Sequence, residues 1–255
     1  MDNLIIEKHS PHINILKIHR PDVLNAVNKA TLEEMLQFLH NKEHQKDCHA
    51  LILTGSGEKS FIAGADIKEM KEMSHVEMLQ FCELGQEVTL ALQKSPFLTL
   101  AAVNGYALGG GFEMALACDF IYASTNAKFG FPEVSLGIIP GFGGTQRISR
   151  AVGTRLSKEL VMSGRIFTAE MAKGWGIVNH LAESDHLMKD CLLAVSDIVR
   201  HSFWATSQAK RAIDIGYHLS MVEALELEKN MCAFCFATKE CNEGMAAFLK
   251  KHKKG

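Results

Sequence analysis

Two groups of residues in this sequence have the types and spacing to perform chemistry. The first combines three consecutive glycines, Gly109, Gly110 and Gly111, with a carboxylate two residues further on, Glu113. Glycines between an expected strand and an expected helix allow positive φ and bring bare N–H groups close to a ligand. A helix N-terminus adds partial positive charge, so this stretch predicts a place where a developing negative charge is stabilised.

The second group is centred on Glu133, which follows a Phe-Gly-Phe-Pro turn at residues 129–132. Two carboxyl groups that share a dry pocket cannot comfortably both be ionised, so one stays protonated while the other acts as a base. Glu113 and Glu133 are therefore candidates for a general acid–base pair. The alternative interpretation is structural: Glu113 would balance a helix dipole, and Glu133 would be a surface acid of a loop.

Further glycines at 141, 143 and 144 do not form a nucleotide fingerprint. No G-x-G-x-x-G follows a strand in the required order, and no Gly-Lys-Ser/Thr occurs in the chain. These absences argue against a Rossmann fold and a P-loop. Gly143 and Gly144 are instead expected to introduce a helix.

Apolar runs predict the strands that must position these residues. Strands are expected over 4–7, 13–18, 50–54, 98–103 and 120–123, the first two forming a hairpin. Residues 61–66, which include Ala63, Gly64 and Ala65, are expected to form a loop of small residues. Strands alternating with helical patterns indicate an α/β fold.

Helical spacing and capping residues predict the helices. They are expected from residue 28, over 74–93, from 111 to about 118 and over 155–162. Thr31 with Glu34 resembles a capping box, as does Ser74 with Glu77. The core contacts of the second helix are expected to include Val76, Leu79 and Leu90. Beyond about residue 183 the pattern is helical throughout.

Composition limits the classes of partner. The chain has 255 residues, 47% hydrophobic and 22% charged, with a formal net charge of −2. This charge provides no general attraction to nucleic acid or to a membrane. The first arginine is Arg20, and no basic segment followed by an apolar run begins the chain, so a cytoplasmic protein, or a mature chain already trimmed, is expected.

Seven cysteines are scattered mostly among apolar neighbours, which is typical of reduced, buried thiols. Cys232 and Cys235 form a C-x-x-C, with Cys241 and His252 further on. A zinc site usually needs a second ligand pair, and a redox C-x-x-C needs a thioredoxin-like context. Neither is present in the sequence, so the preferred interpretation is a row of thiols along one helix, and no metal is expected.

Long motifs in this order resemble the enoyl-CoA hydratase/isomerase family, the crotonase-like proteins. They comprise residues 104–113, 129–133 and 137–147, with further likeness at 61–68 and 243–248. The resemblance implies a spiral of repeated strand-strand-helix units over residues 1–182. It also implies a helical C-terminal region, residues 183–255, that builds a homotrimer, or a hexamer made of two trimers.

The resemblance also assigns roles to single residues. In the implied reaction, Glu113 orients and deprotonates a water molecule, and Glu133 supplies a proton to C2 of a 2-enoyl thioester. The backbone N–H groups of Ala65 and Gly110 hold the thioester oxygen. Further residues are implied to bind substrate or coenzyme A, namely Ala63, Asp66, Ile67, Lys68, Phe248 and Lys251, the last two in a neighbouring subunit. Asp66 and Lys68 also have a plainer interpretation as surface or capping residues.

The implied activity is hydration of a trans-2-enoyl-CoA to a 3-hydroxyacyl-CoA, a reaction of fatty-acid β-oxidation. It needs no metal or redox cofactor, because coenzyme A enters as part of the substrate. One departure keeps an alternative open: typical hydratases of the family have glutamine where this chain has Phe131, and Phe112 is also bulky. Isomerisation, another reaction on a CoA thioester, and a silent acyl-CoA-binding protein are the alternatives.

Overall fold

The computed structural model describes residues 1–252, with the side chains of 44, 45, 251 and 252 outside the description. A six-stranded sheet has the order β1-β2-β3-β5-β7-β10. Its strands are β1 (Leu4–Ser10), β2 (Ile13–Ile18), β3 (Ala50–Gly55), β5 (Leu98–Val103), β7 (Phe120–Ser124) and β10 (His180–Ala182). The expected hairpin β1–β2 is confirmed, and the strands from β2 onward are parallel. The apolar runs of β3 and β5 fit this arrangement, because parallel strands are buried on both faces.

A second sheet has the order β4-β6-β8-β9. It consists of β4 (Ser60–Ala63), β6 (Tyr106–Leu108), β8 (Lys128–Gly130) and β9 (Ile166–Thr168), and only β9 runs antiparallel to its neighbour. The loop expected over 61–66 is therefore wrong in its first half, because residues 60–63 pair with β6. The strand is only four residues long and its partner is more than 40 positions away in the chain, so local pattern did not identify it.

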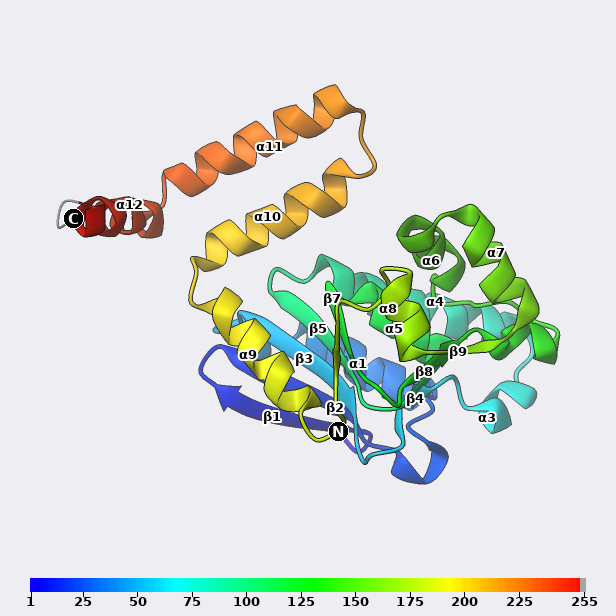
Figure 1. The fold of residues 1–255 in the computed structure, drawn as a ribbon. Coiled ribbons are helices and arrows are strands. Elements are labelled where there is room, and N and C mark those ends of the chain that lie inside the picture. Colours follow the sequence, from blue (N-terminus) through cyan, green and yellow to red (C-terminus); the bar gives the residue numbers. More distant parts are fainter. Residues whose placement is uncertain (253–255) are drawn as a thin grey trace.

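Successive strand pairs are followed by helices, which makes the chain a spiral (Figure 1). After β3 and β4 come α3 (Ile67–Lys71) and α4 (His75–Lys94), and β5 and β6 lead to α5 (Gly110–Ala117). After β7 and β8 come the 3-10 helix η2 (Pro132–Leu136), then α6 (Gly144–Val152) and α7 (Thr154–Ser163). The expected repeat of strand, strand and helix is confirmed. The remaining elements before β10 are η1 (Pro21–Val23), α1 (Lys29–His40), α2 (Lys42–Gln45) and α8 (Ala169–Gly174).

Helix α5 lies in the centre of the core. Each of its first six residues is buried, so it has no solvent-facing side there. The ring of Phe112 contacts those of Phe129, Phe131 and Phe167, at centroid distances of 5.2, 4.8 and 5.8 Å. Gly111 permits a close approach to β4, because a Cβ at this position would lie only 2.0 Å from the carbonyl oxygen of Ile62. This packing fixes where the N-terminus of α5 points.

One of the two expected capping boxes is corrected. The first turn of α1 is capped by Asn28, whose side chain accepts a hydrogen bond from the N–H of Thr31. Glu34 instead accepts from the backbone N–H and the side-chain amide of Asn3, the residue just before β1. The expected capping box of Thr31 and Glu34 is therefore wrong, whereas the box of Ser74 and Glu77 on α4 is confirmed.

Helix α4 buries one face only. Its buried residues are Phe81, Gly85, Val88, Thr89 and Leu92. Three apolar residues expected in the core lie on the opposite face and are exposed, namely Val76 at 60%, Leu79 at 55% and Leu90 at 41%. Apolar character alone could not separate the two faces, because both contain leucine and valine.

Four helices follow β10 within the described residues. Helix α9 (Leu187–Val199) buries Leu187, Cys191 and Val195 against the first sheet. Helices α10 (Phe203–Gly216), α11 (Met221–Phe236) and α12 (Lys239–His252) extend away from the body as a C-terminal arm (Figure 1). The division expected after residue 182 stays a prediction, since α9 packs on the sheet. Within residues 1–252 no helix has the length and apolar character needed to cross a bilayer.

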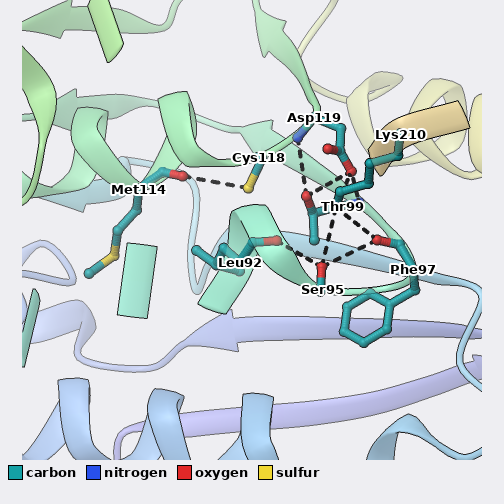
Figure 2. A network of polar contacts seen from close by, with 8 residues as sticks. All are labelled: Leu92, Ser95, Phe97, Thr99, Met114, Cys118, Asp119 and Lys210. Carbon is teal, nitrogen blue, oxygen red and sulfur yellow. Dashed lines mark hydrogen bonds and ion pairs between the residues drawn. The ribbon is translucent and has the colours of Figure 1, made fainter. Parts of the chain in front are cut away.

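The C-terminal arm is attached to the core by Lys210 of α10 (Figure 2). Its ammonium group donates to Ser95 Oγ at 3.3 Å and to the carbonyl of Phe97 at 3.1 Å, and forms an ion pair with Asp119 at 2.9 Å. Asp119 also accepts from the N–H and hydroxyl of Thr99. Because Asp119 comes directly after α5 and Cys118, this network joins the arm to the end of the central helix.

Candidate active site

The carboxyl ends of β4, β6 and β8 meet at one edge of the second sheet. These three strands are parallel and adjacent, and they end at Ala63, Leu108 and Gly130. The segments that follow carry Ala65, the glycines at the start of α5, and Glu133 respectively. Parallel pairing therefore brings together three chemically active segments, each about 20 to 45 residues from the next along the chain.

A cavity of about 80 Å³ lies at this edge. Ala65, Gly110, Glu113 and Glu133 all line it, so the structure brings the four expected residues into one place. The rest of the lining is largely apolar and comes from α3, α4 and residues 132–142, including Met78, Phe81, Cys82, Leu136, Ile138, Ile139 and Phe142. An apolar lining with two carboxyl groups is the environment in which a proton can be exchanged with little interference from bulk water.

Glu113 is almost completely buried, with 1% of its surface exposed. Its Oε1 accepts hydrogen bonds from the backbone N–H of Phe142 at 2.8 Å and from that of Gly144 at 2.6 Å. Burial raises the pKa of Glu113 to about 7, and the negative charge of Glu133 acts in the same direction. The N–H groups of Gly144 and Phe142 oppose this rise in pKa, because they stabilise the ionised form.

Glu133 faces the same cavity from η2. Burial also raises its pKa to about 7. Its Oε2 is buried and has no hydrogen-bond partner within residues 1–252. An unpaired buried oxygen is costly as a carboxylate, and a protonated carboxyl group there can donate to a bound molecule.

Two glycines make room for these carboxyl groups. Gly109 has φ +48°, and a Cβ there would lie 2.5 Å from Oε1 of Glu133. At Gly144 a Cβ would lie 2.9 Å from Oε1 of Glu113 and 2.7 Å from the ring of Phe131. Any side chain at either position would therefore displace a carboxyl group.

The backbone N–H groups of Ala65 and Gly110 are both available. Gly110 begins α5, so its N–H has no acceptor one turn earlier in the helix. Ala65 lies between Gly64, whose carbonyl accepts from Val27, and Asp66, whose N–H donates to Val27. Across the described residues, neither the N–H of Ala65 nor that of Gly110 donates a hydrogen bond. Two free donors on the wall of one cavity could hold a single oxygen.

The other expected binding residues lie in three different situations. Ala63 lines the cavity, and Ile67, which is 59% exposed, lies at its edge. Lys68 is exposed on α3. Asp66 caps α3 by accepting from the N–H of Lys68 and forms an ion pair with Arg20 at 3.0 Å, as the capping interpretation expected.

The residues expected at the C-terminus are not near this cavity in a single chain. Phe248 lies on α12 and is 63% exposed, at the end of the C-terminal arm opposite α3 (Figure 1). The side chain of Lys251 lies outside the described residues. A contribution of Phe248 to the cavity therefore needs a second copy of the chain, as the resemblance implied.

Phe131 and Phe112 lie beneath the cavity. Both are fully buried, and their rings are 4.8 Å apart. Neither lines the cavity within the described part of the chain. Phe131 and Glu113 both lie against Gly144, where a Cβ would be 2.7 Å from the ring and 2.8 Å from Cγ of Glu113.

Sequence reasoning missed the donors that hold Glu113. The N–H groups of Phe142 and Gly144 belong to the glycine cluster at 141–144, which the sequence connected only with a helix start. A possible signal was the cluster itself, because glycines before a helix expose N–H groups for an anion, and a protein carboxylate is such an anion. Phe81 and Cys82 of α4 were also missed as lining residues.

Comparison with known proteins agrees with this fold. The family profile of enoyl-CoA hydratase/isomerase matches residues 8–255. The chain belongs to this family. The short-chain-enoyl-CoA hydratase of Clostridium acetobutylicum is 43% identical over 253 residues, which is 99% of this chain and 97% of that protein. The crotonyl-CoA hydratase of Syntrophomonas wolfei is 40% identical, over 99% and 96% of the two chains.

A solved structure shares the architecture. The crystal structure of enoyl-CoA hydratase from Bacillus anthracis superposes with a TM-score of 0.95 at 34% identity, covering 98% of this chain and 96% of that one. The crotonase-like spiral expected from the sequence is therefore confirmed.

Proposed function

We propose that this protein is an enoyl-CoA hydratase that adds water across the C2–C3 double bond of a short trans-2-enoyl-CoA. One observation carries the proposal: the buried Glu113, and Glu133 with its buried Oε2, line the same small cavity as two backbone N–H groups that have no acceptor among the described residues. The relatives named as hydratases of short-chain and crotonyl thioesters support the choice of reaction and of substrate.

The two N–H groups have the role of an oxyanion hole. As water adds to C3, electron density moves toward the thioester oxygen, and the donors of Ala65 and Gly110 stabilise that charge. Each such donor is worth about 3 kcal/mol in known cases. The partial positive charge at the N-terminus of α5 acts in the same direction as the N–H of Gly110.

The two glutamates divide the proton transfer. Glu113 acts as the base, since two N–H donors stabilise its ionised form, and it takes a proton from the water that attacks C3. Glu133 acts as the acid, because its buried Oε2 has no donor among the described residues and is better occupied by a proton. It gives that proton to C2. One proton leaves the water and one reaches carbon, so the product is a 3-hydroxyacyl thioester.

The small cavity favours a short acyl chain. Phe142 closes it beside Phe81, with ring centroids 5.4 Å apart. A Cβ at Gly85 or at Gly110 would collide with the ring of Phe142, so this ring fills the space between α4 and α5. A long acyl tail would have to displace it.

Coenzyme A is the expected handle of the substrate, and the proposed reaction uses no metal or redox cofactor. Ala63 and Ile67 line the cavity and Lys68 is exposed on α3, which supports these three residues as the proposed contacts of the thioester arm. Phe248 and Lys251 would come from a neighbouring copy in a homotrimer, or in a hexamer of two trimers. The C-terminal arm suits such an assembly, because large apolar residues on it are exposed, among them Ile213, Met221, Val222 and Phe236. A cytoplasmic location completes the proposal.

The decisive experiment follows the absorbance of the enoyl thioester after the protein is added to crotonyl-CoA. We expect rapid loss of absorbance with crotonyl-CoA, much slower loss with a long-chain 2-enoyl-CoA, and little loss with Glu133→Gln. Product analysis with a 3-enoyl thioester separates hydration from isomerisation. Conversion of the 3-enoyl but not of the 2-enoyl substrate would replace the hydratase with an isomerase, and binding without turnover of either would indicate a silent acyl-CoA-binding protein.

A further inference from the structure

Arg147 of α6 holds the segment that binds Glu113. Its Nη1 donates to the carbonyl of Phe142 at 3.0 Å, while Nε and Nη2 donate to Oε1 of Gln93 at 3.2 and 3.1 Å. Gln93 lies near the end of α4. The guanidinium group therefore joins residue 142 to α4 with three hydrogen bonds.

The Phe142 carbonyl is fixed from two sides. Besides Arg147, it accepts from the hydroxyl of Thr89 on α4 at 2.9 Å. The N–H of the same residue donates to Glu113. Gly143, with φ +104°, leaves space for the guanidinium group, because a Cβ at that position would collide with Nη1. Arg147 thus sets the position of the backbone whose N–H groups point at the carboxylate.

Arg147 also acts on Glu113 through its charge. The ionisable groups that influence Glu113 are Arg147 on α6, Glu133 on η2 and Cys82 on α4. Arg147 favours the ionised form of Glu113, whereas Glu133 opposes it. No cation acts in this way on Glu133 among the described residues. The two carboxyl groups thus differ in their surroundings although both line the same cavity.

We propose that Arg147 is a positioning residue that makes Glu113, and not Glu133, the ionised member of the pair. It does so by fixing the N–H donors of Phe142 and Gly144 and by placing a positive charge behind them. The inference rests on the hydratase function proposed above and goes beyond it, because it explains how two similar glutamates take opposite roles.

The test compares two substitutions at Arg147 with a control. Arg147→Gln removes the positive charge. Arg147→Lys keeps the charge but lacks the planar guanidinium group that donates hydrogen bonds to both Gln93 and Phe142. Arg150→Gln is the matched control, since Arg150 lies one turn further along α6 on the exposed surface and donates only to Gln146 within the described residues.

The main readout is the pH profile of kcat with crotonyl-CoA. For Arg147→Gln we expect the acid limb to move upward by about one pH unit. At neutral pH we expect a loss of roughly 10²-fold, of the size that misplacement of a catalytic group causes. Arg147→Lys is expected to keep the acid limb near that of the wild type while losing rate. Arg150→Gln is expected to match the wild type in both respects.

A second readout does not depend on turnover. Infrared difference titration follows the protonated carboxyl band that disappears in Glu113→Gln, and we expect this band to persist to higher pH in Arg147→Gln than in the wild type. Unchanged titration and an unchanged pH profile in folded Arg147→Gln would overturn the inference while leaving the hydratase function standing. If the wild type hydrated no enoyl thioester, the proposed function would fail, and the infrared titration would still decide the role of Arg147.

Discussion

The N–H of Gly144 donates a 2.6 Å hydrogen bond to Glu113, a residue 31 positions earlier in the chain. The bond is possible because residue 144 has no side chain: a Cβ would lie 2.9 Å from the Oε1 that accepts the bond. The start of α6 therefore packs directly against the first turn of α5, with the carboxylate of Glu113 between them.

Gly144→Ala is expected to reduce kcat by about 10²-fold, because the added methyl group would push the carboxylate of Glu113 away from its catalytic position. Gly174→Ala is a suitable control, since nothing lies within 4 Å of a Cβ there and its φ is not positive. It is expected to leave kcat unchanged. Equal activity of both variants would show that Glu113 tolerates displacement.

Glu113→Gln and Glu133→Gln are each expected to lower kcat by about 10²–10⁴-fold, the usual contribution of a group that transfers a proton. Glutamine preserves size, so circular dichroism and the melting temperature are expected to show a folded protein. Hydration measured with crotonyl-CoA checks the loss. Full activity in either variant would remove that glutamate from the mechanism.

The activity is expected to depend on pH as a bell centred near neutrality. Burial raises the pKa of both Glu113 and Glu133 to about 7, and the two titrate as a coupled pair. Rate falls at low pH because the base becomes protonated, and at high pH because the acid loses its proton. A profile of kcat for wild type and Glu133→Gln checks this, and the residual activity of the variant is expected to lack the alkaline limb.

The same raised pKa values have a consequence for stability. Between pH 4.5, the ordinary value, and about 7, the folded protein retains protons that the unfolded chain has released. The contribution of these groups to the free energy of unfolding therefore falls as pH rises through that window. The free energy of unfolding, measured with urea, is expected to decrease less between about pH 5 and about pH 8 for Glu113→Gln than for the wild type.

Lys210→Met is expected to destabilise the protein by about 2 kcal/mol, because it leaves a largely buried Asp119 without its cation. The two side chains are only 11% and 16% exposed. Adding Asp119→Asn is expected to recover part of the loss. Lys229→Met is the control, since the pair of Lys229 with Glu226 is exposed and is expected to contribute little. Thermal unfolding of the four proteins checks the prediction, and equal costs for both lysines would contradict it.

Phe142→Ala is expected to raise the ratio of kcat/KM for a long 2-enoyl-CoA to that for crotonyl-CoA, because the ring that closes the cavity is gone. The backbone N–H that serves Glu113 remains. The loss of a buried ring is expected to cost about 3 kcal/mol of stability, so assays belong well below the new melting temperature. An unchanged ratio would mean that another residue limits chain length.

Much of the fold could be predicted from local pattern. Continuous apolar runs identified β3 and β5 because parallel strands are buried on both faces. Ser74 and Glu77 marked the start of α4 because their capping bonds are local. The prediction for the cap of α1 was wrong because both Thr31 and Asn28 have side chains that can cap a helix. Glu34 accepts a hydrogen bond from Asn3, a residue outside the helix.

The sequence by itself determined which groups could react: two glutamates, and glycine-rich turns that leave N–H groups bare. These properties depend on residue type and on near neighbours. Only the tertiary structure decided that β4, β6 and β8 bring them to one edge and that Phe142 and Gly144 hold Glu113. It also decided that one oxygen of Glu133 is left without a donor in the described part of the chain. The reason is physical: a hydrogen bond or a shared cavity between segments 20 to 80 residues apart depends on how helices and sheets pack, which periodicity along the chain does not encode.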